Sequence, residues 1–226
     1  MKAFPPMDGL DGVLFFFAYE NHIKEAIHKI KFGRDKELLD QLSEETELLL
    51  TDLSGQRIIT NFLADAGITS FNAEREYNNN IEKTVQAFCH KSFSRATCQK
   101  DICREKRGLW LWSGIPTDGG RLRERGFDLP ATLFSSRAQA CGGIWTQALC
   151  RTRKTLPMYG LSPEERKRNL QDCFAVTRDV RGKSIVLADD IFTTGTTFSA
   201  AAAALKEAGA ETVKGIAFCG SVENIR

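Results

Sequence analysis

Short hydrophobic runs alternate with segments of helical periodicity along this chain. The run at 184–188 is apolar and bounded by polar residues, as in a buried strand, whereas 197–208 has an alanine-rich helical pattern closed by Gly209. Strands that alternate with helices predict a parallel sheet in an α/β fold. The expected strands are 13–19, 109–112, 173–176, 184–188 and 212–219, and the expected helices are 20–42, broken at 31–35, 129–140 and 197–208.

Two parts of the pattern leave their structure open. Residues 143–149 fit either a strand or a helix, and 46–108 shows no recognisable motif, so it is either an insertion or a divergent hood. We therefore expect an N-terminal hood or helical part at 1–45, a divergent or inserted segment at 46–108, and an α/β core at 109–226.

Composition is that of an ordinary globular protein, with 42% hydrophobic and 27% charged residues. The most apolar early run, 13–17, is too short to cross a membrane. Seven cysteines without paired spacing, and no signal peptide, predict reduced thiols and a cytoplasmic location. Basic residues are dense at 121–125 and 164–168, but a formal net charge of +2 argues against strong non-specific binding of nucleic acid.

The stretch "SIVLADDIFTTGTT" at 184–197 carries the most informative chemistry. Asp189 and Asp190 stand side by side after the apolar run, although two like charges in contact repel. Ligands bind beyond the carboxyl ends of strands in open α/β sheets, and a helix N-terminus attracts phosphate. The two acids would therefore suit the hydroxyls of a ribose, or a divalent cation. The residues suited to a 5-phosphate are Thr193, Thr194, Gly195, Thr196 and Thr197. Alternatively, a strand-to-helix connection with an ordinary N-cap explains the same residues without any ligand.

Taken whole, 185–197 resembles the signature by which type I phosphoribosyltransferases bind phosphoribosyl pyrophosphate (PRPP). Three further stretches resemble the ComF/GntX-like branch of that superfamily, in the same order. They are "YENHIKEAIHKIKFGRDKELLDQL" (19–42), "IPTDGGRLRERGFD" (115–128) and "GLSPEERKRNLQDCFAV" (160–176). The resemblance implies an α/β fold with a twisted, mostly parallel sheet, flanked by helices and completed by a small hood.

The resemblance also implies roles for individual residues. Asp189 and Asp190 would hold the ribose hydroxyls, and 193–197 the 5-phosphate. The pyrophosphate loop would contain Pro116, Thr117 and Arg121. Arg121 and Arg125 would act in catalysis by neutralising the departing pyrophosphate, although without the flanking match a solvated basic loop is the better interpretation of these arginines.

Further implications concern the cofactor and two flanking segments. Mg²⁺ is the implied cofactor, brought in by PRPP, and in one arrangement Asp189 and Asp190 also bind it. Residues 151–171 resemble the mobile loop that closes over substrate in this superfamily. Lys31 matches the lysine–aromatic pair of the branch and either reaches a substrate or lies at the surface.

The chain departs from the pattern of the branch in two respects. The usual N-terminal zinc ribbon is missing, and the loose cluster in the middle segment lacks the paired spacing of a zinc site, so zinc is not expected. That cluster contains Cys89, His90, Cys98 and Cys103. In addition, Asp128 replaces an asparagine, Thr117 or Asp118 a histidine, and Met158 lies nearest to the position of a glutamine.

Two classes of function fit these features. The first is an enzyme in which a nucleophile attacks the anomeric carbon of PRPP and pyrophosphate leaves, with the acceptor unspecified. The second is a non-catalytic PRPP- or nucleotide-binding protein of the competence type, acting in DNA uptake or processing through a protein partner. The same site would also accept a nucleoside monophosphate, and a homodimer is compatible with either class.

Overall fold

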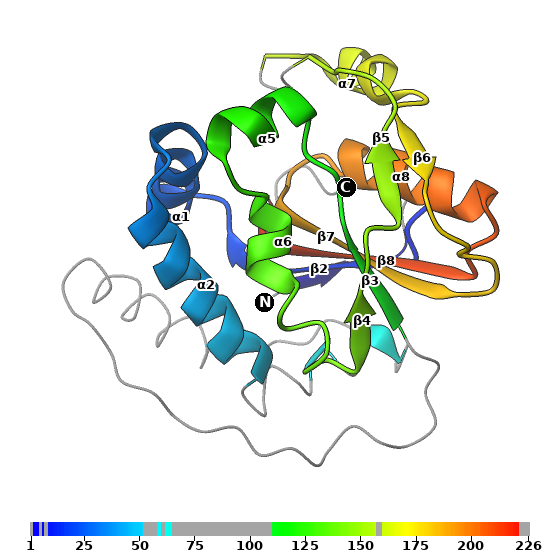
Figure 1. Ribbon diagram of the computed structural model, residues 1–226, viewed down its shortest axis with the longest axis horizontal. Helices are drawn as coiled ribbons and strands as arrows, with labels where there is room; N and C mark the ends of the chain where they lie inside the picture. Colours follow the sequence, from blue (N-terminus) through cyan, green and yellow to red (C-terminus); the bar gives the residue numbers. More distant parts are fainter. Residues whose placement is uncertain are drawn as a thin grey trace.

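The structure, a computed structural model, describes residues 2–4, 6, 9–51, 58, 59, 62–64, 110–156 and 160–221. Within these residues the centre is a six-stranded sheet in the order β1-β2-β8-β7-β3-β4, parallel throughout except for the edge strand β1 (Figure 1). The strands are β1 (Lys2–Phe4), β2 (Val13–Ala18), β3 (Trp110–Gly114), β4 (Gly143–Trp145), β7 (Ser184–Phe192) and β8 (Thr212–Gly220), and β5 (Leu149–Arg151) with β6 (Phe174–Val176) forms a separate antiparallel pair.

Helices flank this sheet, as the α/β prediction requires. They are α1 (Asn21–His28), the π-helical turn η1 (Lys29–Gly33), α2 (Lys36–Thr51), α5 (Gly119–Arg125), α6 (Leu129–Phe134), α7 (Pro163–Leu170) and α8 (Thr196–Glu207). The predicted fold class, a mostly parallel sheet flanked by helices, is confirmed.

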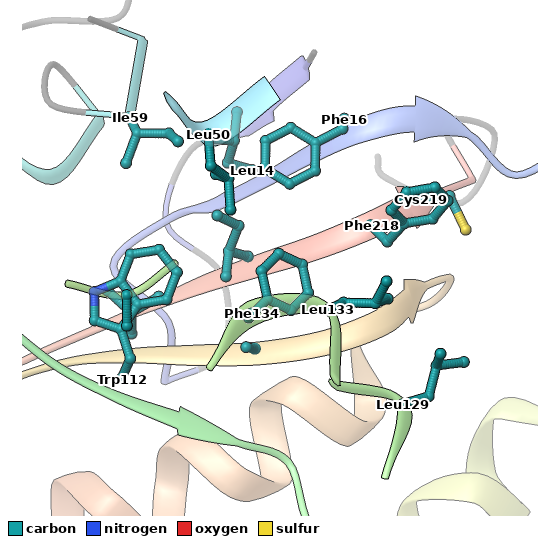
Figure 2. Close-up of a cluster of buried hydrophobic side chains, with 14 of the residues drawn as sticks. Leu14, Phe16, Leu50, Ile59, Trp112, Leu129, Leu133, Phe134, Phe218 and Cys219 are labelled. Atoms are coloured by element: carbon teal, nitrogen blue, oxygen red, sulfur yellow. The ribbon is translucent and has the colours of Figure 1, made fainter. Parts of the chain in front are cut away.

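The sheet is buried on both faces, which explains why its strands read as continuous apolar runs. In β2, Leu14 and Phe16 enter one hydrophobic cluster while Val13 and Phe15 enter another. Figure 2 shows the first cluster, in which Leu14 and Phe16 of β2 gather with Phe218 of β8 beside α6. The second cluster lies under α8, which packs on β7 and β8.

Strand β7 extends beyond the end that its sequence suggests. The run was expected to stop at residue 188, but the strand continues through both acids to Phe192. Ile191 and Phe192 pair with Cys219 and Gly220 of β8, and this pairing outweighs the low strand propensity of aspartate. Asp189 and Asp190 are therefore fixed on a strand of the sheet, and only 193–195 form the turn before α8.

Other differences from the expected elements are local. The arginine-rich stretch 121–125, for which no helix was expected, lies in α5, because Asp118 caps this helix by accepting hydrogen bonds from the backbone N–H groups of Gly120 (3.0 Å) and Arg121 (3.4 Å). The segment 143–149 contributes to the two short strands β4 and β5. Helix α6 ends at Phe134, earlier than the expected 140.

The N-terminal part contributes to the sheet as well as to the helical layer. β1 and β2 are strands of the central sheet, because the apolar residues of β2 need burial on both sides. The expected boundary at residue 45 falls inside α2, and this helix packs against α6. The buried Arg137, which follows α6, donates from its guanidinium to the carbonyl of Ser43 of α2 (2.8 Å). Most of 46–108 lies outside the described residues.

None of the helices in the described part of the chain has both the length and the apolar character needed to cross a membrane. The apolar run at 13–17, which the sequence suggests to be a buried strand, lies within β2.

Candidate functional site

The candidate site lies where β3 and β7 end at the same edge of the sheet. The two strands are parallel neighbours, and the backbone N–H of Ile115 donates to the carbonyl of Ala188 at 2.8 Å. Pro116 and Thr117 therefore leave β3 directly beside Asp189. The fold thus brings together the acid pair, the threonine-rich turn and the start of the expected pyrophosphate loop.

Asp190 is buried, with 6% of its surface exposed, and Lys31 forms an ion pair with its Oδ2 atom. Lys31 is carried by the π-helical turn η1, and the fully buried Ile27 and Ile30 fix this turn against the core. Since a buried charge requires a partner, the ion pair with Lys31 explains how Asp190 can be buried next to a second acid. Of the two interpretations of Lys31, the surface lysine is wrong.

The two carboxyls differ in their environment. Burial acts to raise the pKa of Asp190, but the charge of Lys31, the side-chain hydrogen bonds with Asp189 and Lys31, and the charge of Arg125 together outweigh it, so the pKa of Asp190 is lowered. Burial, and then the charge of Asp190, raise the pKa of Asp189 well above its usual value. The Oδ1 atom of Asp189 accepts the backbone N–H of Asp190 at 2.8 Å. The ionised form is therefore favoured at Asp190 and disfavoured at Asp189.

Two further groups, which the sequence pattern did not identify, lie near the ion pair of Asp190 and Lys31. The thiol of Cys219, on β8, is buried and donates to the carbonyl of Asp190 at 3.4 Å. Burial, with the charge of Asp190, raises the pKa of this thiol well above its usual value, so it is held as a neutral thiol. Burial also raises the pKa of Tyr19, which lies close enough to Lys31 for their charges to interact.

The threonine-rich turn presents a helix N-terminus. Gly195 adopts a left-handed conformation with φ of 73°, and α8 begins at the next residue without a side-chain cap. The hydroxyls of Thr194 and Thr196 hydrogen-bond to each other at 2.8 Å. The backbone N–H groups of the first turn of α8, with the positive end of its dipole, are thus oriented to bind an anion, as predicted for the phosphate.

Thr117 of the expected pyrophosphate loop contacts Asp128, and both positions depart from the ComF/GntX-like pattern if Thr117, rather than Asp118, replaces its histidine. The hydroxyl of Thr117 donates to the Oδ1 atom of Asp128 at 3.2 Å. Burial raises the pKa of Asp128, while the hydrogen bond from Thr117 and the charge of Arg125 act to lower it. The two departures are therefore partners in one interaction. The third, Met158, lies outside the described residues.

The two predicted arginines lie on α5 and face different groups. Arg125 lies 5.7 Å from the ring centroid of Phe127, and its charge helps to lower the pKa of Asp190. Arg121 is half-buried, and it lies close enough to Arg151 for the two like charges to interact. The charge of Arg125 thus acts on Asp190 of the acid pair, and the charge of Arg121 acts on Arg151 of β5.

Arg151 is a residue of the site that the sequence did not identify. It ends β5, and its Nε–H donates to the carbonyl of Pro116 at 2.7 Å. Because 35 residues separate Arg151 from Pro116 in the chain, no local sequence pattern predicts this contact. The one available signal is that Arg151 opens the segment 151–171, which resembles a mobile substrate loop.

Direct binding of a metal by the acid pair does not fit its surroundings. Lys31 already occupies a carboxylate oxygen of Asp190, and ionisation is disfavoured at Asp189. The part of the chain described here contains no cluster of three His, Cys, Asp or Glu side chains suited to a metal ion. The cysteine–histidine cluster of the middle segment lies outside that part. In the described residues Cys150, Cys173 and Cys219 are free thiols.

The buried ion pair generates a prediction about stability. Lys31→Met removes the cation from buried Asp190 and is expected to lower the free energy of unfolding by about 3–5 kcal/mol at pH 7, measured by urea denaturation. The lowered pKa of Asp190 means that the pair stabilises the fold at neutral pH and loses this effect as the pH falls. The difference between the two proteins should therefore narrow in acid.

The matched control is Lys29→Met, in the same turn. Lys29 pairs with Glu25 while both side chains are more than half exposed, so little change is expected. Equal stability of Lys31→Met and the wild type at pH 7 would contradict the importance of the pair.

Comparison with known proteins bears on the same region. The phosphoribosyl transferase domain family matches residues 154–224, which include β7, the threonine-rich turn and α8. The DNA utilization protein YhgH of Salmonella typhimurium is 35% identical over 122 residues, which cover 52% of this chain and 54% of that protein. The proteins of the same name from Shigella flexneri and Escherichia coli K12 are 39% and 38% identical over 106 residues, 46% of this chain and 47% of theirs.

The chain thus spans about half the length of the curated relatives that it matches. The matched domain and the parallel sheet agree with each other and with the motif at 185–197. Residues 154–224 are similar to the phosphoribosyl transferase domain family, and the predicted resemblance of the chain to type I phosphoribosyltransferases of the ComF/GntX-like branch is confirmed.

Proposed function

We propose that this protein binds PRPP at the edge formed by β3 and β7 and transfers its phosphoribosyl group to an acceptor. The observation that carries the proposal is the end of β7, where two carboxyls on the strand are followed, after the turn at 193–195, by a helix N-terminus that has no side-chain cap. Carboxyls that accept hydrogen bonds from hydroxyl groups, and backbone N–H groups that donate hydrogen bonds to a phosphate, suit a ribose 5-phosphate at that spacing. The matched phosphoribosyl transferase domain supports the same conclusion.

Asp189 and Asp190 accept hydrogen bonds from the two ribose hydroxyls in this proposal, and the first turn of α8 donates to the 5-phosphate. The sugar is then held at two points, which fixes its anomeric carbon against the pyrophosphate loop. Because Asp190 is paired with Lys31 in the structure, the ribose must share Asp190 with Lys31 or displace it.

The reaction breaks the bond between the anomeric carbon and the pyrophosphate oxygen, and the electron pair leaves with the pyrophosphate. The acceptor supplies the electron pair of the new bond, while positive charge develops on the sugar. Arg121 and Arg125 offset the negative charge of the leaving group. Mg²⁺ bound to the phosphates of PRPP would supply further neutralising charge.

A non-catalytic role in DNA processing is the second candidate. The contact between Thr117 of the expected pyrophosphate loop and Asp128 favours it, because Asp128 replaces an asparagine of the branch and Thr117 or Asp118 replaces its histidine. The matched relatives are named DNA utilization proteins. Single-stranded DNA binding that weakens steeply with salt, without pyrophosphate release from PRPP, would favour this role.

The first test of the proposal is titration of PRPP with Mg²⁺ into the wild type and into Asp189→Asn/Asp190→Asn. The wild type is expected to bind, and replacing both carboxyls, of which Asp190 is the ionised one, should weaken binding by about a hundredfold or more, measured by calorimetry. Asp189→Asn alone leaves the ion pair of Asp190 intact. Weaker PRPP binding by this single variant would therefore reflect lost contacts to the ligand and not a change in folding.

The control for the acid variants is Asp179→Asn, an exposed acid that pairs with Arg181 away from the turn before α8. It should bind PRPP like the wild type. A well-folded wild type without affinity for PRPP would contradict the proposal.

The left-handed turn provides an independent test. Gly195→Ala places a side chain at a φ of 73°, a strain of about 1–2 kcal/mol, directly before the N–H groups proposed to hold the phosphate. We expect at least about tenfold weaker binding of ribose 5-phosphate by calorimetry, since these N–H groups would be displaced.

Gly182→Ala is the matched control, because Gly182 has a similar φ of 63° and a Cβ there would meet nothing within 4 Å. Thermal unfolding should show that both substitutions destabilise the fold, while only Gly195→Ala weakens binding. Equal effects of the two variants on binding would assign the loss to stability alone.

A further inference from the structure

Arg151 is a half-buried cation held by neutral groups. Besides its bond to Pro116, its Nη1–H donates to the hydroxyl of Thr155 at 2.7 Å, and its guanidinium lies 5.1 Å from the ring centroid of Phe174. Among the described residues, no carboxylate forms an ion pair with it. Burial is the main cause that lowers the pKa of Arg151. The chain therefore holds a positive charge in a partly desolvated place without neutralising it at short range.

The surroundings of Arg151 belong to the candidate site. Pro116, which anchors it, lies in the expected pyrophosphate loop. Asp189 acts to raise the pKa of Arg151, and Arg121 of α5 acts to lower it, so both groups lie near its charge. Arg121 of α5 and Arg151 of β5 are thus two like charges within electrostatic reach of each other, beside the loop that contains Pro116. Such an approach of like charges is unfavourable until an anion lies between them.

The guanidinium has donors left for such an anion. Its Nε and Nη1 atoms are engaged by Pro116 and Thr155, whereas Nη2 makes no hydrogen bond to a residue that the structure describes. The fixed Nε and Nη1 contacts orient the planar group, so the remaining donors are arranged before a ligand binds. Arginine in this setting suits paired phosphate oxygens.

We propose that Arg151 is a diphosphate-binding residue of this site and forms, together with Arg121, a two-arginine clamp across the pyrophosphate loop. The inference rests on the proposed function and adds a residue that lies outside the matched span 154–224. In the transfer reaction, the bond between the anomeric carbon and the diphosphate oxygen breaks and its electron pair stays on the diphosphate. The clamp offsets the charge that the diphosphate gains.

The test is calorimetric titration of inorganic pyrophosphate with Mg²⁺, and separately of ribose 5-phosphate, into the wild type and Arg151→Met. Pyrophosphate binding is expected to weaken by about tenfold or more, because a charge-assisted hydrogen bond is lost. Binding of ribose 5-phosphate should stay within about twofold, since its proposed contacts come from β7 and α8. Arg151→Lys keeps the charge without the planar fork, so it should lose a smaller part and serves if Arg151→Met fails to fold.

The control is Arg181→Met. Arg181 is exposed, lies outside the segment 151–171 and pairs with Asp179, so neither titration should change. Pyrophosphate affinity equal to that of the wild type in Arg151→Met, or an equal loss of both ligands, would overturn the assignment of Arg151. The proposed function would still stand if ribose 5-phosphate binding depended on Asp189 and Asp190. A wild type that binds neither ligand would contradict both.

Discussion

The burial of Asp190 is the constraint on which the rest of the site depends. A carboxylate at the end of an interior strand is stable only with a cation beside it, and here that cation comes from the opposite end of the chain. Lys31 reaches it because Ile27 and Ile30 anchor its turn in the core cluster that also contains Phe134 of α6. The ion pair therefore joins the N-terminal helical layer to the strand that carries the candidate ligand site.

The same ion pair gives the two adjacent acids unequal properties. Lys31 favours the charge of Asp190, and this charge in turn disfavours ionisation of Asp189. Adjacent carboxyls with opposite tendencies can accept hydrogen bonds from neighbouring hydroxyls without the full repulsion of two anions. On the other side of the edge, Arg125, Arg121 and Arg151 provide positive charge from α5 and β5. The site is thus arranged with acceptors toward β7 and donors toward the loop after β3.

The sequence pattern was sufficient to predict those elements whose structure depends mainly on neighbouring residues. The apolar run of β2 and the motif of β7 were recognised because both depend on neighbouring residues, and the helical spacing of Ile27 and Ile30 located α1. Contacts between distant segments were not predictable in this way. The end of β7 was misplaced because pairing with β8 decides it, and the ion pair of Lys31 depends on a residue at the far end of the chain. Arg151 was missed for the same reason, since its anchor is a backbone carbonyl on another element.

The π-helical geometry of Lys29–Gly33 has a consequence for how this segment can change over evolution. A π-helical turn contains an additional residue compared with an α-helix of the same length. The turn therefore absorbs one residue without changing the direction of the segments on either side, and deleting that residue would leave a regular helix. A deletion of one residue within α1 would instead rotate Lys31 by about 100° about the axis relative to the start of the helix. Length changes are therefore expected to be excluded from α1 and tolerated only within Lys29–Gly33, provided that Lys31 and the buried Ile30 are kept.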